Sequence, residues 1–163
     1  MVIEYILPHV SFSNDVSGFP QCYNHLYQRM NNSMQENLEH LPDEVITGLE
    51  AFRNEAFYAA HEYFEDAWRK TPDPSREFFR ALLHISGGFY RLTQDRPVAA
   101  KKFFTHAIKW LAFFPYRFAD IQTDLLIFNL EQVIQAFESS RSSEKILKEY
   151  LKPIQTILEM RTP

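Results

Sequence analysis

The residues best suited to bind a ligand or to take part in catalysis are a histidine and two glutamates in the stretch from Phe57 to Arg69. This stretch has helical spacing, so His61 and Glu65 lie one turn apart and can point to the same place, while Glu62 lies about 100 degrees further around the helix. An apolar stripe that includes Trp68 lies beside them. Burial of an unpaired polar group costs on the order of 2 to 7 kcal/mol, so neighbouring elements must supply partners for these side chains.

The pattern His-Glu-x-x-Glu-x-x-Trp has two interpretations. In the structural one, His61 and Glu65 form a hydrogen-bonded pair that orients the packing of Trp68, which we expect to be largely buried. In the functional one, the same side chains bind a ligand or a metal ion. The pattern differs from the His-Glu-x-x-His of metalloproteases and from the Glu-x-x-His of ferritin-like proteins, so it does not specify a metal. Four histidines lack an acidic or histidine partner at ligand spacing and are left out of the predicted site: His9, His25, His40 and His106.

The elements around this stretch are helical. The chain has only 4 glycines and many strong helix formers, which favours an all-α fold of six or seven helices. We expect a single domain, residues 1–163, built from antiparallel helical hairpins, with the helices of residues 57–70 and 74–93 packed together at its centre. The other expected helices span residues 21–38, 42–52, 97–114, 120–137 and about 144–160. Residues 1–20 are expected to be irregular.

Local signals predict how the helices begin and end. In the turn after residue 52, Asn54 is the residue that best tolerates a left-handed conformation. Asp73 and Pro74 predict a helix start, as the N-cap and the first helical residue. Gly87 and Gly88 remove side chains where another helix could approach closely. We therefore expect tight connections and at least one close helix contact.

An internal similarity at an offset of 40 residues relates two parts of the chain. Residues of one part match residues of the same kind in the other, namely Leu49, Phe52, Ala59, Ala60 and Phe64 with Phe89, Leu92, Ala99, Ala100 and Phe104. Each part then consists of a helix, a tight turn and a returning helix. Because the offset is longer than the roughly 34 residues of a tetratricopeptide repeat, we interpret it as a helical hairpin repeat without assigning it to that class.

The composition excludes several classes of function. A formal net charge of −4 and a pI near 5.9 leave no basic surface for nucleic acid. A single cysteine, Cys22, permits neither an internal disulfide nor a cysteine-based zinc site, which suits a cytoplasmic protein. No stretch reaches the roughly 18 apolar residues of a membrane span, and we expect no membrane partner. Gly-x-Ser-x-Gly and phosphate-loop motifs are absent. Aromatic residues make up 15% of the chain, which favours self-association.

Two segments of the sequence resemble a known family. The first contains Phe52, the pair Phe57-Tyr58 and the run from Ala60 to Arg69, and the second is the run from Phe79 to Tyr90. Together they resemble the small all-helical family known as domain of unknown function 309. The resemblance covers about residues 45–137 and implies a helical fold with a shared polar pocket. It implies no known activity.

The chain also departs from this family. An N-terminal extension, residues 1–41, and the last predicted helix lie outside the family-like core. Family members usually carry glutamines where this chain has Arg80 and His84, and a glycine where it has Glu55. The resemblance implies that Arg80 and His84 face the helix that bears His61. An arginine and a histidine in place of two neutral amides change the charge of the pocket and could alter its ligand.

The leading functional hypothesis is a non-enzymatic binding or scaffold module with a polar pocket around His61. We expect its partner to be another protein or a second copy of the chain, with a homodimer as the simplest case, and we expect no cofactor. A small ligand is also compatible with the pocket. The alternative is a small-molecule or metal-dependent enzyme of hydrolase type, with a carboxylate as general base and Arg80 stabilising negative charge. The candidate pocket residues are His61, Glu62, Glu65, Trp68, Arg69, Arg80 and His84, and the enzyme hypothesis uses all of these except Trp68 and Arg69.

The arginine argues against a metal in this pocket. His61, His84 and Glu65 could form a two-histidine, one-carboxylate set of the kind that binds zinc or iron. Arg80 lies one turn from His84 and puts a fixed positive charge beside any such ion. We therefore predict that the protein holds no stoichiometric transition metal. We expect Arg80 to pair with Glu62 or Glu65 in a hydrogen-bonded polar core or an anion pocket.

Overall fold

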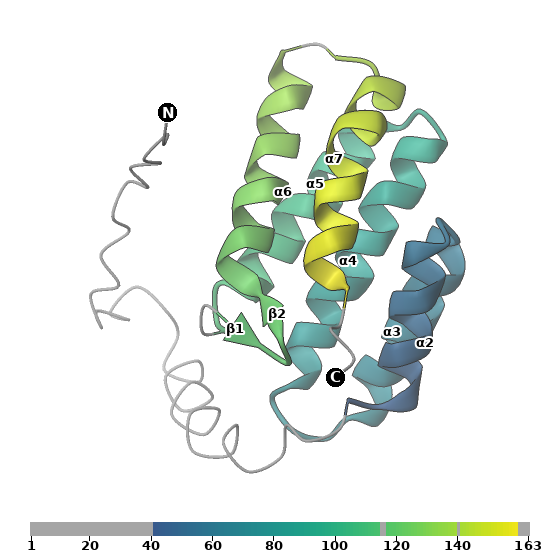
Figure 1. The fold of residues 1–163 in the computed structure, drawn as a ribbon, viewed down its shortest axis with the longest axis vertical. Helices are drawn as coiled ribbons and strands as arrows, with labels where there is room; N and C mark the ends of the chain where they lie inside the picture. The colour runs from purple at the N-terminus through teal and green to yellow at the C-terminus, as the bar shows by residue number, and fades with distance from the viewer. Residues whose placement is uncertain (1–40, 115–116, 140, 160–163) are drawn as a thin grey trace, which may run out of the picture.

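The fold is all-α in the part of the chain that the computed structural model describes, residues 41–114, 117–139 and 141–159. These ranges contain six α-helices and one short two-stranded hairpin (Figure 1), which confirms the predicted class. The predicted helix at 21–38 and the predicted irregular segment at 1–20 lie outside the described residues. No helix of the described ranges combines the length and the apolar character needed to cross a membrane.

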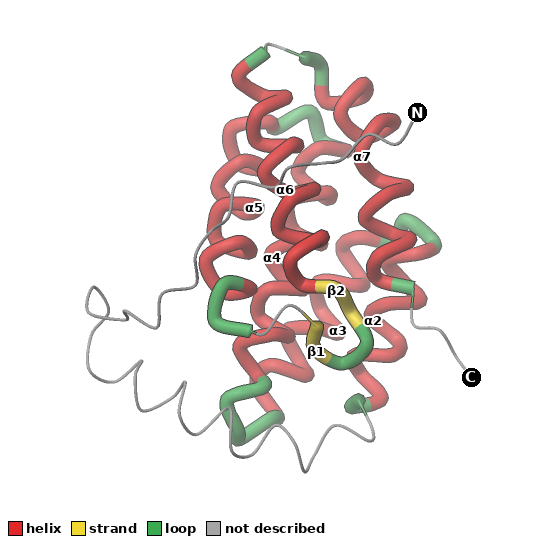
Figure 2. The backbone as a smooth tube through the Cα atoms, turned by 60° about the vertical axis from the view of Figure 1, so that its left-hand side comes forward, coloured by secondary structure: helices red, strands yellow, loops and turns green. Residues whose placement is uncertain are grey.

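The helices lie roughly side by side, and each packs against the next one in the chain (Figure 2). Prolines mark two of the starts: Pro97 is the first residue of α5, as predicted, whereas Pro42, expected as the first residue of its helix, is the N-cap of α2. The bounds of the helices are α2 Asp43–Arg53, α3 Phe57–Lys70, α4 Arg76–Thr93, α5 Pro97–Leu111, α6 Thr123–Glu138 and α7 Ser143–Leu158.

The central helix is α4, because it is apolar around most of its circumference. Seven large apolar side chains of this helix are buried: Phe78, Phe79, Leu82, Leu83, Ile85, Phe89 and Leu92. Such a helix must be covered on several sides, and α4 packs against α3, α5 and α7 (Figure 1). The predicted packing of the helices of residues 57–70 and 74–93 is therefore confirmed. Only a narrow stripe of α4 remains for polar side chains.

Two glycines let phenylalanine rings lie directly against a helix backbone. A Cβ atom at Gly88 would lie 2.4 Å from a ring carbon of Phe104, and one at Gly48 would lie 2.6 Å from a ring carbon of Phe64. Carbon atoms pack at about 3.5–4.0 Å, so neither position has room for a side chain. The close approach predicted at Gly88 is confirmed, and the second pair lies at an offset of 40 residues from the first.

The turns after α2 and α4 have the same construction. Glu55 and Asp95 have positive φ angles of 61° and 52°. In each turn the following N–H group, of Ala56 or Arg96, donates to a carbonyl group five residues earlier, as in a Schellman motif. The expectation for Asn54 is wrong, since its φ is −82°. The motif puts the left-handed residue one position after the C-cap, and Asn54 is itself the C-cap.

The start of α4 also differs from the prediction. Asp73 is not its N-cap, because α4 begins at Arg76 with Ser75 in the cap position. Instead, Oδ1 of Asp73 accepts a hydrogen bond of 2.9 Å from the N–H of Ser75. Aspartate side chains commonly bind their own backbone two residues on, and here this bond stabilises the turn that precedes the helix.

A hairpin that the sequence did not predict shortens the sixth helix. The strands β1, Arg117–Phe118, and β2, Ile121–Gln122, pair in antiparallel orientation. Both residues between them, Ala119 and Asp120, have positive φ angles of 50° and 61°, as in a type I′ turn. Asp120 was expected to begin a helix, but α6 begins at Thr123.

The last helix, α7, contacts both helical hairpins of the core, the pair α2 and α3 and the pair α4 and α5. The side-chain amide of Gln155 donates to the carbonyl of Arg53 at 3.0 Å, and the hydroxyl of Ser143 donates to Asp95 at 2.7 Å. Ser142 caps the helix by accepting from the N–H of Lys145. Pro153 lies inside this helix, which continues through it to Leu158.

Candidate functional site

His61 is held by the backbone of α4. Its Nδ1 lies 2.9 Å from the carbonyl oxygen of Leu83, and because a carbonyl can only accept, Nδ1 carries the proton. Gly87 makes room for this contact: a Cβ atom there would lie 3.3 Å from Nδ1 of His61 and 2.7 Å from a ring carbon of Phe103. His61 is thus half-buried at the contact of α3 with α4, with its ring oriented by the main chain.

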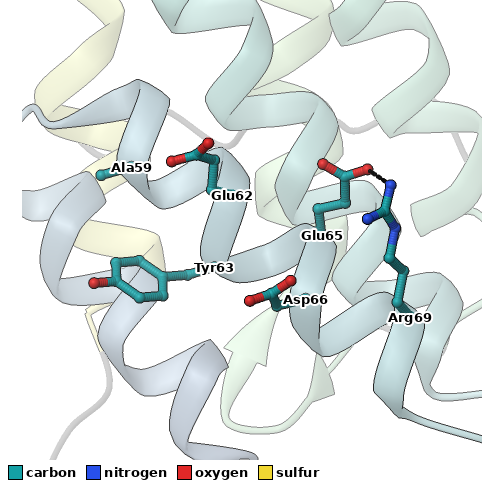
Figure 3. A pocket seen from close by; sticks show the side chains of 6 residues that line it. All are labelled: Ala59, Glu62, Tyr63, Glu65, Asp66 and Arg69. Atoms are coloured by element: carbon teal, nitrogen blue, oxygen red, sulfur yellow. Dashed lines mark hydrogen bonds and ion pairs between the residues drawn. The ribbon is translucent and has the colours of Figure 1, made fainter.

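The two glutamates of the predicted pocket line a groove on α3. Figure 3 shows the side chains that line this groove, which has a volume of about 390 Å³. Neither Arg80 nor His84 contributes to its lining. The residues that line it all come from α3 and are Ala59, Glu62, Tyr63, Glu65, Asp66 and Arg69. The predicted pocket is therefore not one site: Glu62, Glu65 and Arg69 line this groove, whereas Arg80 and His84 lie outside it on α4.

Both glutamates have partners on their own helix. Oε1 of Glu65 accepts a hydrogen bond of 2.6 Å from Arg69. A hydrogen bond with Glu62 raises the pKa of Tyr58, and the negative charge of Glu62 adds to this effect. His61 donates instead to the main chain, so the hydrogen-bonded pair of His61 and Glu65 that the sequence suggested does not form.

Arg80 lies between the two tryptophans of the chain. Its guanidinium carbon is 5.2 Å from the ring centroid of Trp68 on α3 and 4.2 Å from that of Trp110 on α5. Arg76, one turn earlier on α4, lies 5.0 Å from the ring centroid of Trp68. We call these four residues the arginine–tryptophan cluster. Trp68 is only partly buried, contrary to expectation, because one side of its ring packs against guanidinium groups and not against the apolar core.

The arginine–tryptophan cluster has more hydrogen-bond donors than acceptors. Glu77 is 3.4 Å from Arg80 Nη1 and 3.8 Å from Arg76 Nε, both longer than the about 2.7–2.9 Å of a strong charge-assisted bond. Nε1 of Trp68 and Nε of Arg76 are buried and have no hydrogen-bond partner. The predicted pairing of Arg80 with Glu62 or Glu65 is wrong, because Glu77 lies within reach on the same helix, three residues away.

His84 continues the polar stripe of α4 by one more turn. Its ring centroid lies 5.8 Å from that of Phe103 and 5.4 Å from that of His106, both on α5. Its Nδ1 is buried without a hydrogen-bond partner. Burial lowers the pKa of His84 from 6.5 to about 4, and the nearby positive charges of His106, Arg80 and His61 add to this effect. The imidazole of His84 is therefore neutral near pH 7.

The three side chains that were weighed as metal ligands, His61, His84 and Glu65, are not arranged to hold a metal ion. Within the described ranges, no three side chains of His, Cys, Asp or Glu lie close enough together to hold one. Nδ1 of His61 is bound to a carbonyl group, Glu65 is paired with Arg69, and the positive charge of Arg80 lies near His84. The absence of stoichiometric metal from the purified protein stays a prediction.

Three of the seven predicted pocket residues meet at one face of α4. Arg80 and His84 belong to this face, and Trp68 of α3 packs against it. His61 lies close enough to affect the pKa of His84, whereas Glu62, Glu65 and Arg69 belong to the groove on α3. Four residues that complete this face were not predicted, namely Arg76 on α4 and Phe103, His106 and Trp110 on α5.

The spacing of the missed residues could have revealed them. Arg76 lies four residues before Arg80, so both face the same side of one helix. Phe103, His106 and Trp110 are separated by three and four residues, which puts them on one side of the next helix. Their meeting depends on the turn between α4 and α5, and no spacing within one helix reports that.

Comparison with known families supports the resemblance. Residues 45–103 match the family described as Domain of unknown function (DUF309), which confirms the resemblance for this segment. The segment contains α3 and α4, most of α2 and the first part of α5, so it includes Trp68, Arg76 and Arg80 but not Trp110. No curated protein and no solved structure matches the chain.

Proposed function

We propose that the DUF309 segment and the helices that complete it form a non-enzymatic binding module, with the arginine–tryptophan cluster as its partner site. The observation that carries this proposal is a pair of buried donors without partners, Nε1 of Trp68 and Nε of Arg76, beside Arg80, whose contact with Glu77 is long at 3.4 Å. Buried donors without partners are costly, at about 1–3 kcal/mol each, and a bound partner with acceptor groups would recover this cost. Trp and Arg are also enriched among the residues that dominate binding energies.

The contacts of the polar residues favour binding over the alternative of hydrolysis. A general base must lie within hydrogen-bond reach of the proton it removes. Glu65 forms an ion pair with Arg69, and Glu62 forms a hydrogen bond with Tyr58, both on α3. Arg80, which would stabilise negative charge in an enzyme, lies on α4 and outside the lining of the groove on α3. The groups that a hydrolase needs at one point thus have separate partners on separate helices.

A second copy of the chain is the simplest partner in this proposal. The described surface exposes several large apolar side chains, of which Val98 is 74% and Tyr58 is 54% exposed. Exposed apolar groups on a protein surface favour association, and these two lie at the opposite ends of α5 and α3 from Trp110 and Trp68. A homodimer formed through this surface would need no other component.

Two further expectations belong to the same proposal. The matching offsets of Gly48 and Gly88, and of Glu55 and Asp95, support a helical hairpin repeat as the framework of the module. A cytoplasmic location is supported by the single cysteine, since the chain has no second one to form an internal disulfide.

The test compares Arg80→Gln with Arg91→Gln. Arg91 is a matched control, because it lies on the same helix and its guanidinium carbon is also near an aromatic ring, 5.6 Å from the centroid of Tyr90. We expect the wild type and Arg91→Gln to self-associate, or to retain the same partner from a lysate, with equal strength. Arg80→Gln should weaken the association at least about tenfold, or 1.4 kcal/mol. The measurements are static light scattering over a concentration series and a quantitative pull-down.

The proposal fails if the wild type stays monomeric at high concentration and retains no partner that depends on Arg80. It also fails if Arg80→Gln and Arg91→Gln behave alike. Circular dichroism on each variant separates a loss of binding from a loss of folding.

A further inference from the structure

The two arginines of the cluster share a single carboxylate. Glu77 is the ion-pair partner of both Arg76 and Arg80 among the described residues, so the three side chains carry a net charge of +1. Each guanidinium has five N–H donors in a planar fork, and the long contacts to Glu77 use few of them. The arginine side chains are 34% and 35% exposed, so a ligand from solvent can reach them. The site therefore offers accessible positive charge within a protein of net charge −4.

The indole rings hold these guanidinium groups in a defined orientation. Arg80 contacts both Trp68 and Trp110, at 5.2 Å and 4.2 Å from the ring centroids. A guanidinium that stacks on an aromatic ring still directs its N–H groups outward in its own plane. The rings thus restrict the rotation of Arg80 without consuming its donors. Pre-orientation of this kind lowers the entropy that binding costs.

The groups that lack partners indicate the chemistry of the ligand. Two of the unpartnered buried atoms, Nε1 of Trp68 and Nε of Arg76, carry hydrogen atoms and can only donate. A cation would be repelled by Arg76 and Arg80, and an apolar group would leave the donors unsatisfied. An oxyanion offers several acceptor oxygens together with a compensating charge.

The carboxylates nearby do not already fill this role. Glu65 is paired with Arg69 at 2.6 Å, and Glu62 is hydrogen-bonded to Tyr58. His84, one turn beyond Arg80, has an unpartnered ring nitrogen and no carboxylate contact in the described part of the chain. Among the described residues, the polar stripe of Arg76, Arg80 and His84 thus has Glu77 as its one carboxylate partner.

We propose that the arginine–tryptophan cluster binds an oxyanion group of a ligand, a phosphate or a carboxylate, with Arg80 as its main anchor and Arg76 as a second donor. This inference rests on the proposed binding function and names the chemical class that its site accepts. The exposed guanidinium groups meet the anion first. The buried N–H of Trp68 lies on the ring that both guanidinium groups contact, so the environment of this indole changes on binding.

The chain provides its own reporter for this site. Its only 2 tryptophans are Trp68 and Trp110, and both contact Arg80. A ¹H–¹⁵N spectrum of the full chain therefore contains two indole signals, and both report on the cluster. We expect titration with inorganic phosphate or with acetate to shift the Trp68 indole signal in a saturable way. A concentration of about 10 mM would fill roughly nine-tenths of a site whose Kd is 1 mM.

The matched controls are sodium chloride at equal ionic strength and two arginine variants. Chloride at equal ionic strength should produce a smaller, non-saturating shift, because it screens charge without bridging two guanidinium groups. Arg80→Gln should abolish the saturable shift, whereas Arg91→Gln, on the same helix, should retain it. Arg80→Lys keeps the charge but loses the planar fork, and we expect at least a tenfold weaker response.

The outcomes separate the two sources of the anion and the two proposals. A saturable shift with phosphate alone assigns a phosphoryl group, and a shift with acetate as well assigns oxyanions in general. No saturable shift with either anion overturns the inference, as does an equal shift in Arg80→Gln. If Arg80→Gln does not fold, the same comparison made with Arg76→Gln decides the question. A partner that depends on Arg80 but is retained without any anion response would leave the binding function standing and remove only the oxyanion.

Discussion

His84 combines a titratable ring with an environment that opposes its charge. Burial is the main cause, and the positive charges of His106, Arg80 and His61 add to it, so the pKa of His84 falls from 6.5 to about 4. Above pH 6.5 the ring is neutral in both the folded and the unfolded chain. Between pH 6.5 and pH 4 the unfolded chain binds a proton that the folded chain refuses. We therefore expect this residue to reduce the free energy of unfolding as the pH falls through that range.

The comparison that isolates this effect is wild type against His84→Gln. Chemical denaturation at a series of pH values should show a steeper loss of stability below pH 6.5 in the wild type than in the variant. The ring signals of His84 should titrate near pH 4 in an NMR experiment. In His106→Gln the same signals should titrate at a higher pH, because one of the opposing charges is gone. A titration of His84 near pH 6.5 in the wild type would contradict the structure.

At the scale of elements, the turn between α2 and α3 carries a cost that one substitution can remove. Glu55 has a φ of 61°, where a side chain costs roughly 1–2 kcal/mol that glycine does not pay. Its neighbour Asn54 has an ordinary φ of −82°. We expect Glu55→Gly to raise the free energy of unfolding by about 1 kcal/mol, because glycine fits the left-handed position of a helix C-terminus.

Asn54→Gly is the matched control for this turn. At an ordinary φ, glycine only adds freedom to the unfolded chain, so Asn54→Gly should lower stability by about 0.5–1 kcal/mol. Urea denaturation of the two variants and the wild type should show changes of opposite sign in the free energy of unfolding. If both variants changed the free energy of unfolding in the same direction, the left-handed residue would have been assigned to the wrong position.

The contact of α4 with α5 depends on glycine for a different reason, namely space. A Cβ atom at Gly88 would lie 2.4 Å from Phe104, whose ring is fully buried and cannot move aside. We expect Gly88→Ala to lower the free energy of unfolding by about 1–3 kcal/mol, although alanine is the better helix former by about 1 kcal/mol. Thermal unfolding followed by circular dichroism measures this loss.

Gly87→Ala should behave differently, because its neighbour Phe103 is only partly buried and can shift. We expect a smaller loss of stability than for Gly88→Ala. The ring signals of His61 should move, since the new methyl group would lie 3.3 Å from Nδ1 and disturb its bond to Leu83. A larger loss for Gly87→Ala than for Gly88→Ala would show that the two glycines have been given the wrong roles.

At the scale of the whole molecule, the sequence predicts elements better than their connections. The starts of α3 and α5 follow from periodicity and from Pro97, because both are local properties of the chain. The apolar circumference of α4 likewise predicts its central place. The hairpin of residues 117–122 was missed because Ala119 and Asp120 have no strong turn signature, although both adopt positive φ.

The candidate site shows where prediction from one sequence ends. The spacing of His61 and Glu65 predicts a shared direction, yet a backbone carbonyl of α4 binds the first and Arg69 binds the second. A carbonyl group leaves no trace in the amino-acid sequence, so this partner could not be predicted. The contact of Arg80 with Trp110 depends on how α4 and α5 cross, and that angle is set by packing.

The most distant of these contacts supports a final prediction about how the molecule closes. Gln155 on α7 is buried, and its amide donates to the carbonyl of Arg53 at 3.0 Å and, more weakly, to that of Phe52 at 3.5 Å. The last carbonyl groups of a helix have no partner within the helix. Gln155 therefore completes the C-terminus of α2 and connects α7 to the first hairpin of the described fold.

Gln155→Leu keeps an apolar stem of similar size but removes the donor, so it leaves the carbonyl of Arg53 without this partner. We expect it to lower the free energy of unfolding by about 1–3 kcal/mol. Gln135→Leu is the matched control, because Gln135 is exposed on α6, where substitutions usually change stability by less than about 0.5 kcal/mol. Hydrogen exchange should report faster exchange in α2 and α7 of Gln155→Leu, with α5 unchanged. Equal stability of the two variants would show that α7 closes the molecule through its apolar contacts alone, through Ile146, Ile154 and Leu158.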